Sequence, residues 1–351
     1  MRATLQTVAD AIGVSRSTVS NAYSRPDQLS PELRERIFEA ARQLGYSGPH
    51  PAARSLRKGR VGAIGVLFSA TLSYAFTDPY AVQFLRGLAE TAERHDTGLL
   101  LMPLSGDHES ATAAVQNAVV DGFCVYCLPD WDEAYAGLRL RRLPVVSADA
   151  QAQADPQAKF VGIDESAATR EAGRHLAALG HRHIGVIADW IVPERVTRPV
   201  RLEAPEDVPY YVSRERLAGY RDAFADIDVP WHDLSLVNAA QNSRQAAAAA
   251  AAHLLDRAPR VTAIVAVSDI LALGVLDALQ ARGLQAGRDV SVIGFDDIPD
   301  AAAMGLTTIR QPAMEKGRIA GALLLDPPAS EADSRVLLPT ELIVRASTGP
   351  A

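Results

Sequence analysis

Short apolar runs, each followed by a stretch with helical periodicity, constrain the fold of this chain more than any other feature. The runs lie at 61–68, 98–103, 122–127, 143–148, 159–163, 183–188, 234–238, 263–267 and 290–295. Each has the length and composition of a strand buried on both faces. Alternation of strand and helix predicts parallel sheets with right-handed crossovers and helices on both faces. The predicted fold class is therefore α/β and doubly wound, with two sheets, a cleft between them, and a closely packed helix at the alanine run 246–252.

The first 46 residues carry a different pattern, which is typical of short helices. Apolar side chains at i, i+3, i+4 and i+7 from Leu5 predict a first helix, and Gly13 permits the left-handed turn that ends it. Ser15 is suited to cap a second helix, whose narrow apolar stripe is Val19 and Tyr23. Two helices joined by a tight glycine-containing turn, the second with small polar side chains facing outward, are typical of a helix-turn-helix. A three-helix bundle that binds protein fits the same spacing.

A third helix and an excess of positive charge complete this N-terminal region. Ser30, followed by a proline, favours a helix start, and apolar residues at helical spacing line its core face from Leu33 to Leu44, before Gly45. Residues 1–60 contain ten basic and five acidic side chains, a net charge of +5, whereas the whole chain carries −7. A basic head on an acidic body favours nucleic acid as the partner of the head.

Ordered motifs run along nearly the whole chain. They are TLQTVADAIGVSRSTVSNAYSRPDQLSPELRERIFEAARQLGY from position 4, AARSLR from 52, GAIGVL from 62, GIDE from 162, LAALGHRHIGVI from 176, ERLAGYRDAF from 215, VSDILALGVLDAL from 267, DVSVIGFDD from 289, LTTIRQP from 306 and LPTELIVRAST from 338. By these motifs the chain resembles the lactose/galactose-repressor (LacI/GalR) family. The resemblance implies a helix-turn-helix head and a periplasmic-binding-protein-like body, whose two Rossmann-like lobes are joined by three crossing strands.

The resemblance also implies that the outer face of the second helix reads the major groove of DNA. We predict DNA contacts from the head and the segment after it, at Thr4, Leu5, Ser15, Arg16, Ser17, Thr18, Ser20, Asn21, Ala53, Arg54, Leu56 and Arg57. Many family members carry arginine at the position of Asn21. An amide favours adenine, whereas a guanidinium favours guanine or a phosphate, so a family consensus operator does not follow for this chain.

The segment 49–60, PHPAARSLRKGR, is shorter than the ~12–15 residues that an isolated helix needs in water. It carries four cations, no acid and a single large apolar side chain, Leu56. In the family, the matching segment becomes a helix on operator DNA, where two copies pack in a minor groove and the leucine enters a base step. The residues agree with that role, because cations suit phosphates and an apolar wedge suits a kinked duplex. A solvated basic linker is the alternative.

Polar residues at the C-terminal ends of the predicted strands are candidates for a ligand site, because ligands of open α/β sheets bind there. The strand ends supply Ser69, Asp149, Asp164, Ser268, Asp269, Asp296 and Asp297. The resemblance implies effector contacts at Asp149, Arg216, Ser268 and Asp296. Asp164 and Asp269 fit a second role equally well, as helix N-caps, and Asp297 fits a structural one. We predict that Asp296 and Arg216 clamp the effector and that neither is needed for core packing.

Two segments depart from the common family pattern. Residues 69–84 place Tyr74 and Phe76 where relatives grip small effectors, which suits a ligand with an apolar ring face. Residues 189–213 lie where most members have a short loop, and their prolines and aromatic residues favour an ordered lid over a solvated excursion. The effector is therefore expected to be a sugar, as the family implies, or a nucleoside with its aromatic base.

Other functions lack their motifs. The pair Cys124 and Cys127 falls in an apolar run, which predicts buried structural cysteines and not a redox pair or zinc site. His181 and His183 have no carboxylate at metal-binding spacing and are predicted to pack or to lie on the surface. No dinucleotide fingerprint, P-loop or nucleophile elbow appears, so we predict no enzyme, no metal and no cofactor. No export signal opens the chain and no run reaches the ~18 apolar residues of a membrane span, which predicts a cytoplasmic protein that contacts no membrane.

These predictions combine into a ligand-responsive transcriptional regulator of the repressor type. Residues 1–48 form the DNA-binding domain, residues 49–60 the hinge, and residues 61–351 the two-lobed domain that binds the effector and dimerises. A homodimer is expected to bind pseudo-palindromic double-stranded operator DNA, one head per half-site. The alternative outside this class is a sugar-binding protein without catalytic activity.

Overall fold

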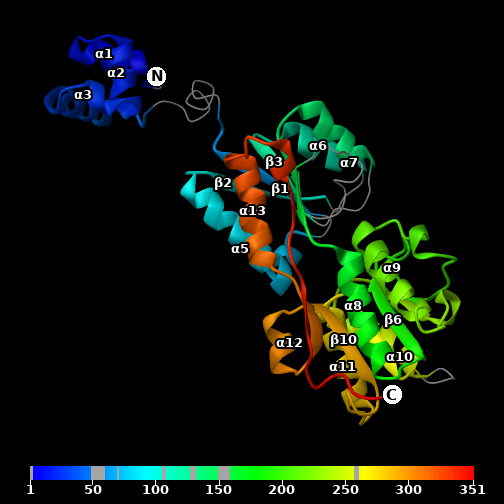
Figure 1. The fold of residues 1–351 in the computed structure, drawn as a ribbon. Helices are drawn as coiled ribbons and strands as arrows, with labels where there is room; N and C mark the ends of the chain where they lie inside the picture. The colour runs from blue at the N-terminus through cyan, green and yellow to red at the C-terminus, as the bar shows by residue number, and fades with distance from the viewer. Residues whose placement is uncertain are drawn as a thin grey trace. The chain divides into compact units, whose positions relative to one another are not determined.

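In the computed structural model, the chain divides into an N-terminal unit, Met1–Gly62, and a second unit, Ala63–Ala351 (Figure 1). The structure describes residues 3–48, 60–68, 71–104, 108–126, 132–148, 159–256 and 261–351. The predicted contact residues Ala53, Arg54, Leu56, Arg57, Ser69 and Asp149 therefore lie outside the described residues, as does Cys127.

The N-terminal unit contains the three predicted helices, each begun by a side-chain cap. They are α1 (Leu5–Ile12), α2 (Arg16–Ser24) and α3 (Pro31–Gln43), with a short 3-10 turn, η1 (Pro26–Gln28), before α3. The hydroxyl oxygens of Thr4, Ser15 and Ser30 accept hydrogen bonds from backbone N–H groups of the first turns. Gly13 ends α1 with a φ of 71°, as predicted for the left-handed turn.

Apolar side chains from all three helices form the core of this unit. The buried members are Val8, Ala9, Val19, Ala22, Ile37, Ala40 and Ala41. The ring of Tyr23 packs edge-on against Phe38 and Tyr46, with centroid distances of 5.1 and 6.0 Å. The placement of Leu44 on the core face was wrong, because α3 ends at Gln43 and Leu44 is left 43% exposed.

The second unit contains two sheets. The first has the order β12-β5-β4-β3-β1-β2, and all its paired strands are parallel. Its strands are β1 (Ala63–Phe68), β2 (Gly98–Pro103), β3 (Gly122–Tyr126), β4 (Val145–Ser147), β5 (Lys159–Gly162) and β12 (Arg335–Leu337). Its helices are α5 (Pro79–Arg94), α6 (His108–Asn117), α7 (Asp132–Arg141) and α13 (Ala313–Leu325), of which α5 and α13 pack side by side (Figure 1).

The second sheet has the order β13-β11-β10-β9-β6-β8-β7, with the two edge strands antiparallel to their neighbours. Its strands are β6 (Ile184–Asp189), β7 (Arg198–Val200), β8 (Ser235–Ala239), β9 (Ala263–Ala266), β10 (Ser291–Asp296), β11 (Thr307–Arg310) and β13 (Glu341–Ile343). Its helices are α8 (Glu165–Ala178), α9 (Tyr211–Ala225), α10 (Arg244–Leu255), α11 (Asp269–Ala281) and α12 (Pro299–Ala303). Short 3-10 turns are η2 (Tyr74–Phe76), η4 (Pro205–Asp207), η5 (Trp231–Asp233) and η6 (Glu331–Ser334).

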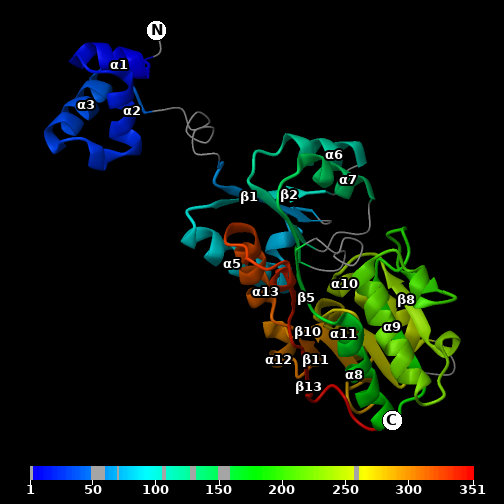
Figure 2. The same cartoon turned by 45° about the horizontal axis from the view of Figure 1, so that its top comes forward.

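The chain passes between the sheets three times, after β5, after β11 and after β12 (Figure 2). Each predicted apolar run contains a strand, which confirms the α/β fold class. The strands β7, β11, β12 and β13 were not among the predicted runs.

The alanine run forms most of α10, as predicted, and its small side chains allow close packing against α11. Ala247, Ala250 and Ala251 are fully buried. A Cβ added to Gly274 of α11 would lie 2.3 Å from the carbonyl oxygen of Arg244, so the two backbones approach at this point too closely for a side chain. Among the described residues, no helix is both long and apolar enough to cross a membrane.

Candidate functional site

The predicted DNA-reading helix, α2, has an exposed N-terminal turn that carries no acid. Arg16 and Ser17 are exposed, whereas Leu5, Thr18 and Asn21 are half-buried. Thr4 and Ser15 are exposed and use their hydroxyl oxygens as caps. Backbone N–H groups at such a helix start, together with a cation, make a suitable surface for a phosphate or a base edge.

The prediction that Ser20 points outward was wrong. Ser20 is 8% exposed and belongs to the buried face of α2 with Val19 and Ala22. The buried stripe is therefore wider than the Val19–Tyr23 pair from which the outward set was inferred.

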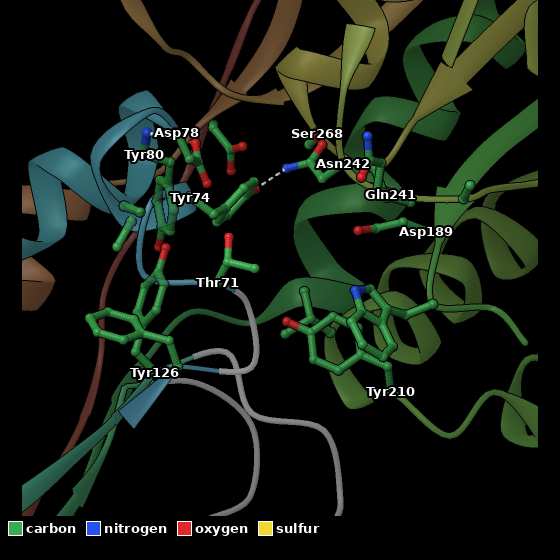
Figure 3. Close-up of a pocket in the computed structure, with 18 of the residues that line it drawn as sticks. Thr71, Tyr74, Asp78, Tyr80, Tyr126, Asp189, Tyr210, Gln241, Asn242 and Ser268 are labelled. Carbon is green, nitrogen blue, oxygen red and sulfur yellow. Dashed lines mark hydrogen bonds between the residues drawn. The ribbon is translucent and has the colours of Figure 1, made fainter. Parts of the chain in front are cut away.

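A cavity of about 210 Å³ lies between the two sheets of the second unit (Figure 3). Its lining combines aromatic rings, amides, hydroxyls, carboxylates and guanidinium groups, and consists of Phe68, Thr71, Tyr74, Ala75, Asp78, Tyr80, Ala81, Tyr126, Asp189, Trp190, Arg195, Tyr210, Val212, Arg216, Ala240, Gln241, Asn242, Val267, Ser268 and Asp296. An apolar cavity with a few converging polar groups is the usual form of a small-molecule site.

Of the predicted effector residues, Tyr74, Arg216, Ser268 and Asp296 line this cavity. Phe76 does not, because it lies at the exposed end of the turn η2 and is 62% exposed, so its prediction was wrong. Asp269 does not line it either. Its buried carboxylate accepts hydrogen bonds from the backbone N–H of Ile298, at 2.9 Å, and from the hydroxyl of Thr308, at 2.6 Å.

Of Asp164 and Asp269, each of which fits either a ligand contact or a helix cap by sequence, only Asp164 is a cap. Asp164 caps α8 by accepting a hydrogen bond from the N–H of Ala167. The cap of α11 is Ser268 and not Asp269. Burial raises the pKa of Asp269 to about 7, and its bonds to Ile298 and Thr308 connect α11 to the segment after β10 and to β11.

Arg216, on α9, is buried and held on several sides. Its Nε donates to Oε2 of Glu165 at 2.7 Å, its Nη1 donates to the carbonyl oxygen of Val267, and its guanidinium carbon lies 3.6 Å from the ring centroid of Phe295. Burial opposes the charge of Arg216, but Glu165 and Asp296 outweigh it and hold the pKa above its ordinary value. The prediction that Arg216 is not needed for packing was therefore wrong.

Asp296 ends β10 with a φ of 120°, a conformation that costs a residue with a side chain of order 1–3 kcal/mol. Its Oδ1 accepts a hydrogen bond of 2.6 Å from Nε2 of Gln311, which lies on the second passage between the sheets. Burial raises the pKa of Asp296 well above its ordinary value, and Arg216 opposes that shift. The next residue, Asp297, is structural, since its carboxylate pairs with Arg310 and Arg345 at 2.8 and 2.7 Å.

Sequence reasoning missed two further carboxylates of the cavity. Asp78 begins α5, where its Oδ1 accepts a hydrogen bond from the N–H of Tyr80 at 3.0 Å. Asp189 ends β6, and burial raises its pKa to about 6. The rule that selects polar residues at strand ends selects Asp189 as well, whereas Asp78 follows a segment without strand character.

The segment 189–213 is ordered, as predicted. It adds the edge strand β7 to the second sheet and brings Trp190, Arg195 and Tyr210 to the cavity. The guanidinium carbon of Arg195 lies 4.6 Å from the Trp190 ring centroid, and the rings of Trp190 and Tyr210 are 6.4 Å apart. Trp190 and Tyr210 thus form one wall of the cavity, whereas Tyr211, the third aromatic residue of this segment, does not line it.

Cys124, His181 and His183 were predicted to be buried or to lie on the surface. Cys124 is fully buried in the core of the first sheet. His181 is buried and bonds to the hydroxyls of Thr262 and Ser291, whereas His183 is exposed. Within the described part of the chain, no group of histidine, cysteine and acidic residues is arranged to hold a metal ion.

Two family models match the chain. Residues 4–48 match bacterial regulatory proteins of the lacI family, and residues 174–348 match a periplasmic binding protein-like domain. An HTH-type transcriptional regulator of Mycolicibacterium smegmatis is 42% identical over 359 residues, which cover 99% of this chain and 97% of the relative.

Several solved structures are similar over the whole length. A LacI-family transcriptional regulator from Corynebacterium glutamicum is 35% identical, with a TM-score of 0.75 and 99% of both chains covered. The transcriptional regulator CelR in complex with cellobiose is 28% identical, with a TM-score of 0.67, and 99% of this chain and 100% of that chain are covered. The Lac repressor dimer bound to operator and the anti-inducer ONPF is alike in fold, at 24% identity and a TM-score of 0.76, with 99% of both chains covered.

Proposed function

The chain belongs to the lacI family of bacterial transcriptional regulators, and from that premise we propose how it acts. Two copies bind a pseudo-palindromic operator through their N-terminal units, and a small ligand held between the two sheets of each second unit controls that binding. The observation that carries the proposal is the presence, in one chain, of a helix-turn-helix and a polar cavity between two α/β lobes. We also propose that the protein acts in the cytoplasm, where bacterial operator DNA lies.

For the head, exposure and charge support DNA reading. Arg16 and Ser17 are exposed on the first turn of α2, which has no acid to repel phosphate. We propose that Arg16 reads a base edge and that Asn21, half-buried farther along the helix, favours adenine. Leu56, which lies outside the described residues, is proposed to enter a minor-groove base step together with its copy in the dimer.

For the cavity, the lining supports binding and not catalysis. Charged and amide groups from both sheets surround a space bounded by aromatic rings, an arrangement suited to a ligand with several hydroxyl groups. The solved structure of CelR contains cellobiose, which supports a sugar as the effector here. A nucleoside is the second candidate, because the neighbouring rings of Trp190 and Tyr210 provide a face on which a base can stack.

The proposal is tested by selecting binding sites for the full-length chain from a pool of random double-stranded DNA. We expect enrichment of a sequence with two inverted half-sites, bound about a thousandfold or more tightly than shuffled DNA at the same salt concentration. A pool that stays random, or binding equal on selected and shuffled DNA, would contradict the assignment of α2 as a sequence reader. Removal of residues 1–48 is the control and should abolish binding to both kinds of DNA.

A further inference from the structure

We propose that the cavity accepts an uncharged, hydroxyl-rich ring and excludes its phosphorylated or carboxylated counterparts. This inference rests on the proposed function, since it specifies the ligand of that same cavity. It is carried by two features of the lining: carboxylates that reach the cavity from both lobes, and an aromatic wall that the segment 189–213 supplies.

The carboxylates face the cavity from opposite sides. Asp78 comes from the start of α5 beside the first sheet, and Asp189 comes from the end of β6 in the second sheet (Figure 3). Asp296 ends β10 of the second sheet and also lines the cavity. Asp78 and Asp296 each accept a hydrogen bond from within the protein, on Oδ1. Within the described residues, no other side chain donates a hydrogen bond to the carboxylate of Asp189. These groups are acceptors, so they suit a ligand that presents hydroxyl donors.

Within the described ranges, three carboxylates line the cavity, against two guanidinium groups. The buried cation Lys316 is not among the lining residues, and its Nζ donates to the Tyr80 hydroxyl at 2.7 Å and to Oε1 of Gln311 at 3.0 Å. Arg216 and Arg195 are the guanidinium groups among the lining residues that the structure describes. Arg216 already pairs with the buried carboxylate of Glu165. Arg195 lies over the Trp190 ring and is otherwise exposed, so water weakens its field. Among the lining residues that the structure describes, a phosphate would therefore meet more carboxylates than guanidinium groups, and the buried guanidinium already has a carboxylate partner.

Burial of the carboxylates increases the preference of the cavity for an uncharged ligand over an anion. It raises the pKa of Asp78 above its ordinary value and the pKa of Asp189 to about 6, and the charge of Asp78 adds to the upward pKa shifts of Asp189 and Asp296. The cavity thus already disfavours its own negative charges, and an additional anion is disfavoured for the same reason. Hydroxyl groups stabilise the ionised carboxylates by donating hydrogen bonds, without adding charge.

The aromatic wall explains why a ring is preferred over an open chain. Trp190 has a φ of 55°, which is rare for a residue with a large side chain, and Asn238 holds the segment that follows it. The Oδ1 of Asn238 accepts from the N–H of Ile191 at 3.2 Å, and its Nδ2 donates to the carbonyl oxygen of Val196 at 2.7 Å. The backbone beside Trp190 is therefore held in place, and the indole lines the cavity with a flat apolar surface.

Trp190 also supplies a test that works before any ligand has been identified. The chain has three tryptophans, so the double substitution Trp131→Phe, Trp231→Phe leaves the cavity indole as the only one. Its fluorescence is quenched with iodide, with caesium and with neutral acrylamide at matched ionic strength. We expect iodide to quench about threefold or more weakly than caesium at about pH 7.5, while acrylamide shows that the indole is reachable.

Substitutions then assign that exclusion to the carboxylates. Asp78→Asn and Asp189→Asn should each raise iodide quenching about twofold, whereas Asp164→Asn, an exposed cap outside the cavity, should leave it unchanged. If a cavity variant does not fold, lowering the pH to about 5 shifts the cavity carboxyls of Asp78, Asp189 and Asp296, whose pKa values burial raises, toward their protonated forms. In the unsubstituted chain this should raise iodide quenching in the same direction. Equal quenching by iodide and caesium would overturn the proposal. So would iodide quenching that changes neither on substitution of the aspartates nor on lowering the pH.

Matched pairs identify the ligand class directly. Glucose with glucose 6-phosphate and adenosine with its 5′-monophosphate are compared by thermal unfolding of the full chain. If either compound of a pair raises the unfolding temperature, we expect it to be the uncharged one. A phosphorylated compound that raises the unfolding temperature more than its uncharged counterpart overturns the proposal. Operator binding is measured in a separate experiment. A chain that fails to bind a selected operator but excludes iodide contradicts the proposed function alone. A chain that binds the operator but is quenched equally by iodide and caesium contradicts this inference alone.

Discussion

The side chains of Tyr74 and Asn242 meet across the cavity, where Nδ2 of Asn242 donates a hydrogen bond of 2.7 Å to the hydroxyl oxygen of Tyr74 (Figure 3). Tyr74 belongs to the turn η2 that follows the first strand, and Asn242 follows β8 of the second sheet. The Oδ1 of Asn242 accepts from Ser268, the cap of α11. Two hydrogen bonds through Asn242 thus connect the first lobe to the start of α11 in the second, at a place where a ligand hydroxyl would compete for them.

We expect this contact to stabilise the arrangement of the two lobes by about 0.5–1.5 kcal/mol. A double-mutant cycle of Tyr74→Phe and Asn242→Ala, measured by urea unfolding, should show a coupling free energy in that range. Phe76→Leu, in the same turn but exposed, is the matched control and should leave the free energy of unfolding unchanged. Strict additivity of the two single changes would mean that the bond contributes nothing.

The buried pair Arg216 and Glu165 should be costly to break. Glu165→Gln removes the carboxylate that pairs directly with the buried guanidinium of Arg216 and leaves only the charge of Asp296 nearby, so we expect the free energy of unfolding to fall by about 3–5 kcal/mol. Glu171→Gln on the same helix, α8, is the control, because Glu171 is exposed. The two variants are compared by denaturant unfolding, and equal stabilities would show that the pair does not support the second lobe.

The pH dependence of stability should report Asp189. Burial raises the pKa of Asp189 to about 6 in the folded chain, whereas an aspartate in an unfolded chain titrates near ~4. Between these values the folded state binds more protons, so this group's contribution falls as the pH rises. Asp189→Asn cannot titrate, and its stability relative to wild type should increase from about pH 4 to about pH 7 and then level off. A difference that is constant over this range would show that the pKa of the Asp189 carboxyl is not raised.

The head should lose specificity when its exposed arginine is removed. Arg16→Ala is expected to weaken binding to the selected operator by about 1–3 kcal/mol and to relax the preference at one base position. Arg36→Ala on α3, where the side chain is also exposed, controls for the loss of a positive charge. Band-shift titrations on operator and on shuffled DNA decide the case, because an equal loss on both would show that Arg16 contacts only phosphate.

The fold was predicted well because strands and helix starts are specified by neighbouring residues along the chain. Apolar runs in the strands and caps such as Ser15 and Ser30 act locally, and they appear in the structure where expected. The edge strand β7 was missed because three residues containing a proline have no strand signal of their own. Its pairing is decided by β8, to which it is antiparallel.

The candidate site was predicted in part, since strand ends are visible in a sequence but side-chain directions are not. The strand-end rule located Ser268 and Asp296, and the same rule applies to Asp189, which was not chosen. Tyr74 and Phe76 occupy one 3-10 turn, yet one lines the cavity and the other faces solvent. Tyr74 is turned toward the cavity by its hydrogen bond with Asn242, which is distant in the sequence. The residues around Tyr74 therefore carry no pattern that predicts its direction.

The central claim is that a ligand in this cavity changes the affinity of the chain for its operator. The most direct measurement is the dissociation constant of the full chain for the selected operator, with and without the compound that stabilises the protein most, for wild type and for Asp296→Asn. In wild type we expect a change of about tenfold, within the usual range of coupling between sites, and in Asp296→Asn an operator affinity close to wild type that no longer responds to the compound. An unchanged operator affinity of the wild-type chain, at a ligand concentration where calorimetry shows the cavity to be saturated, would contradict the account.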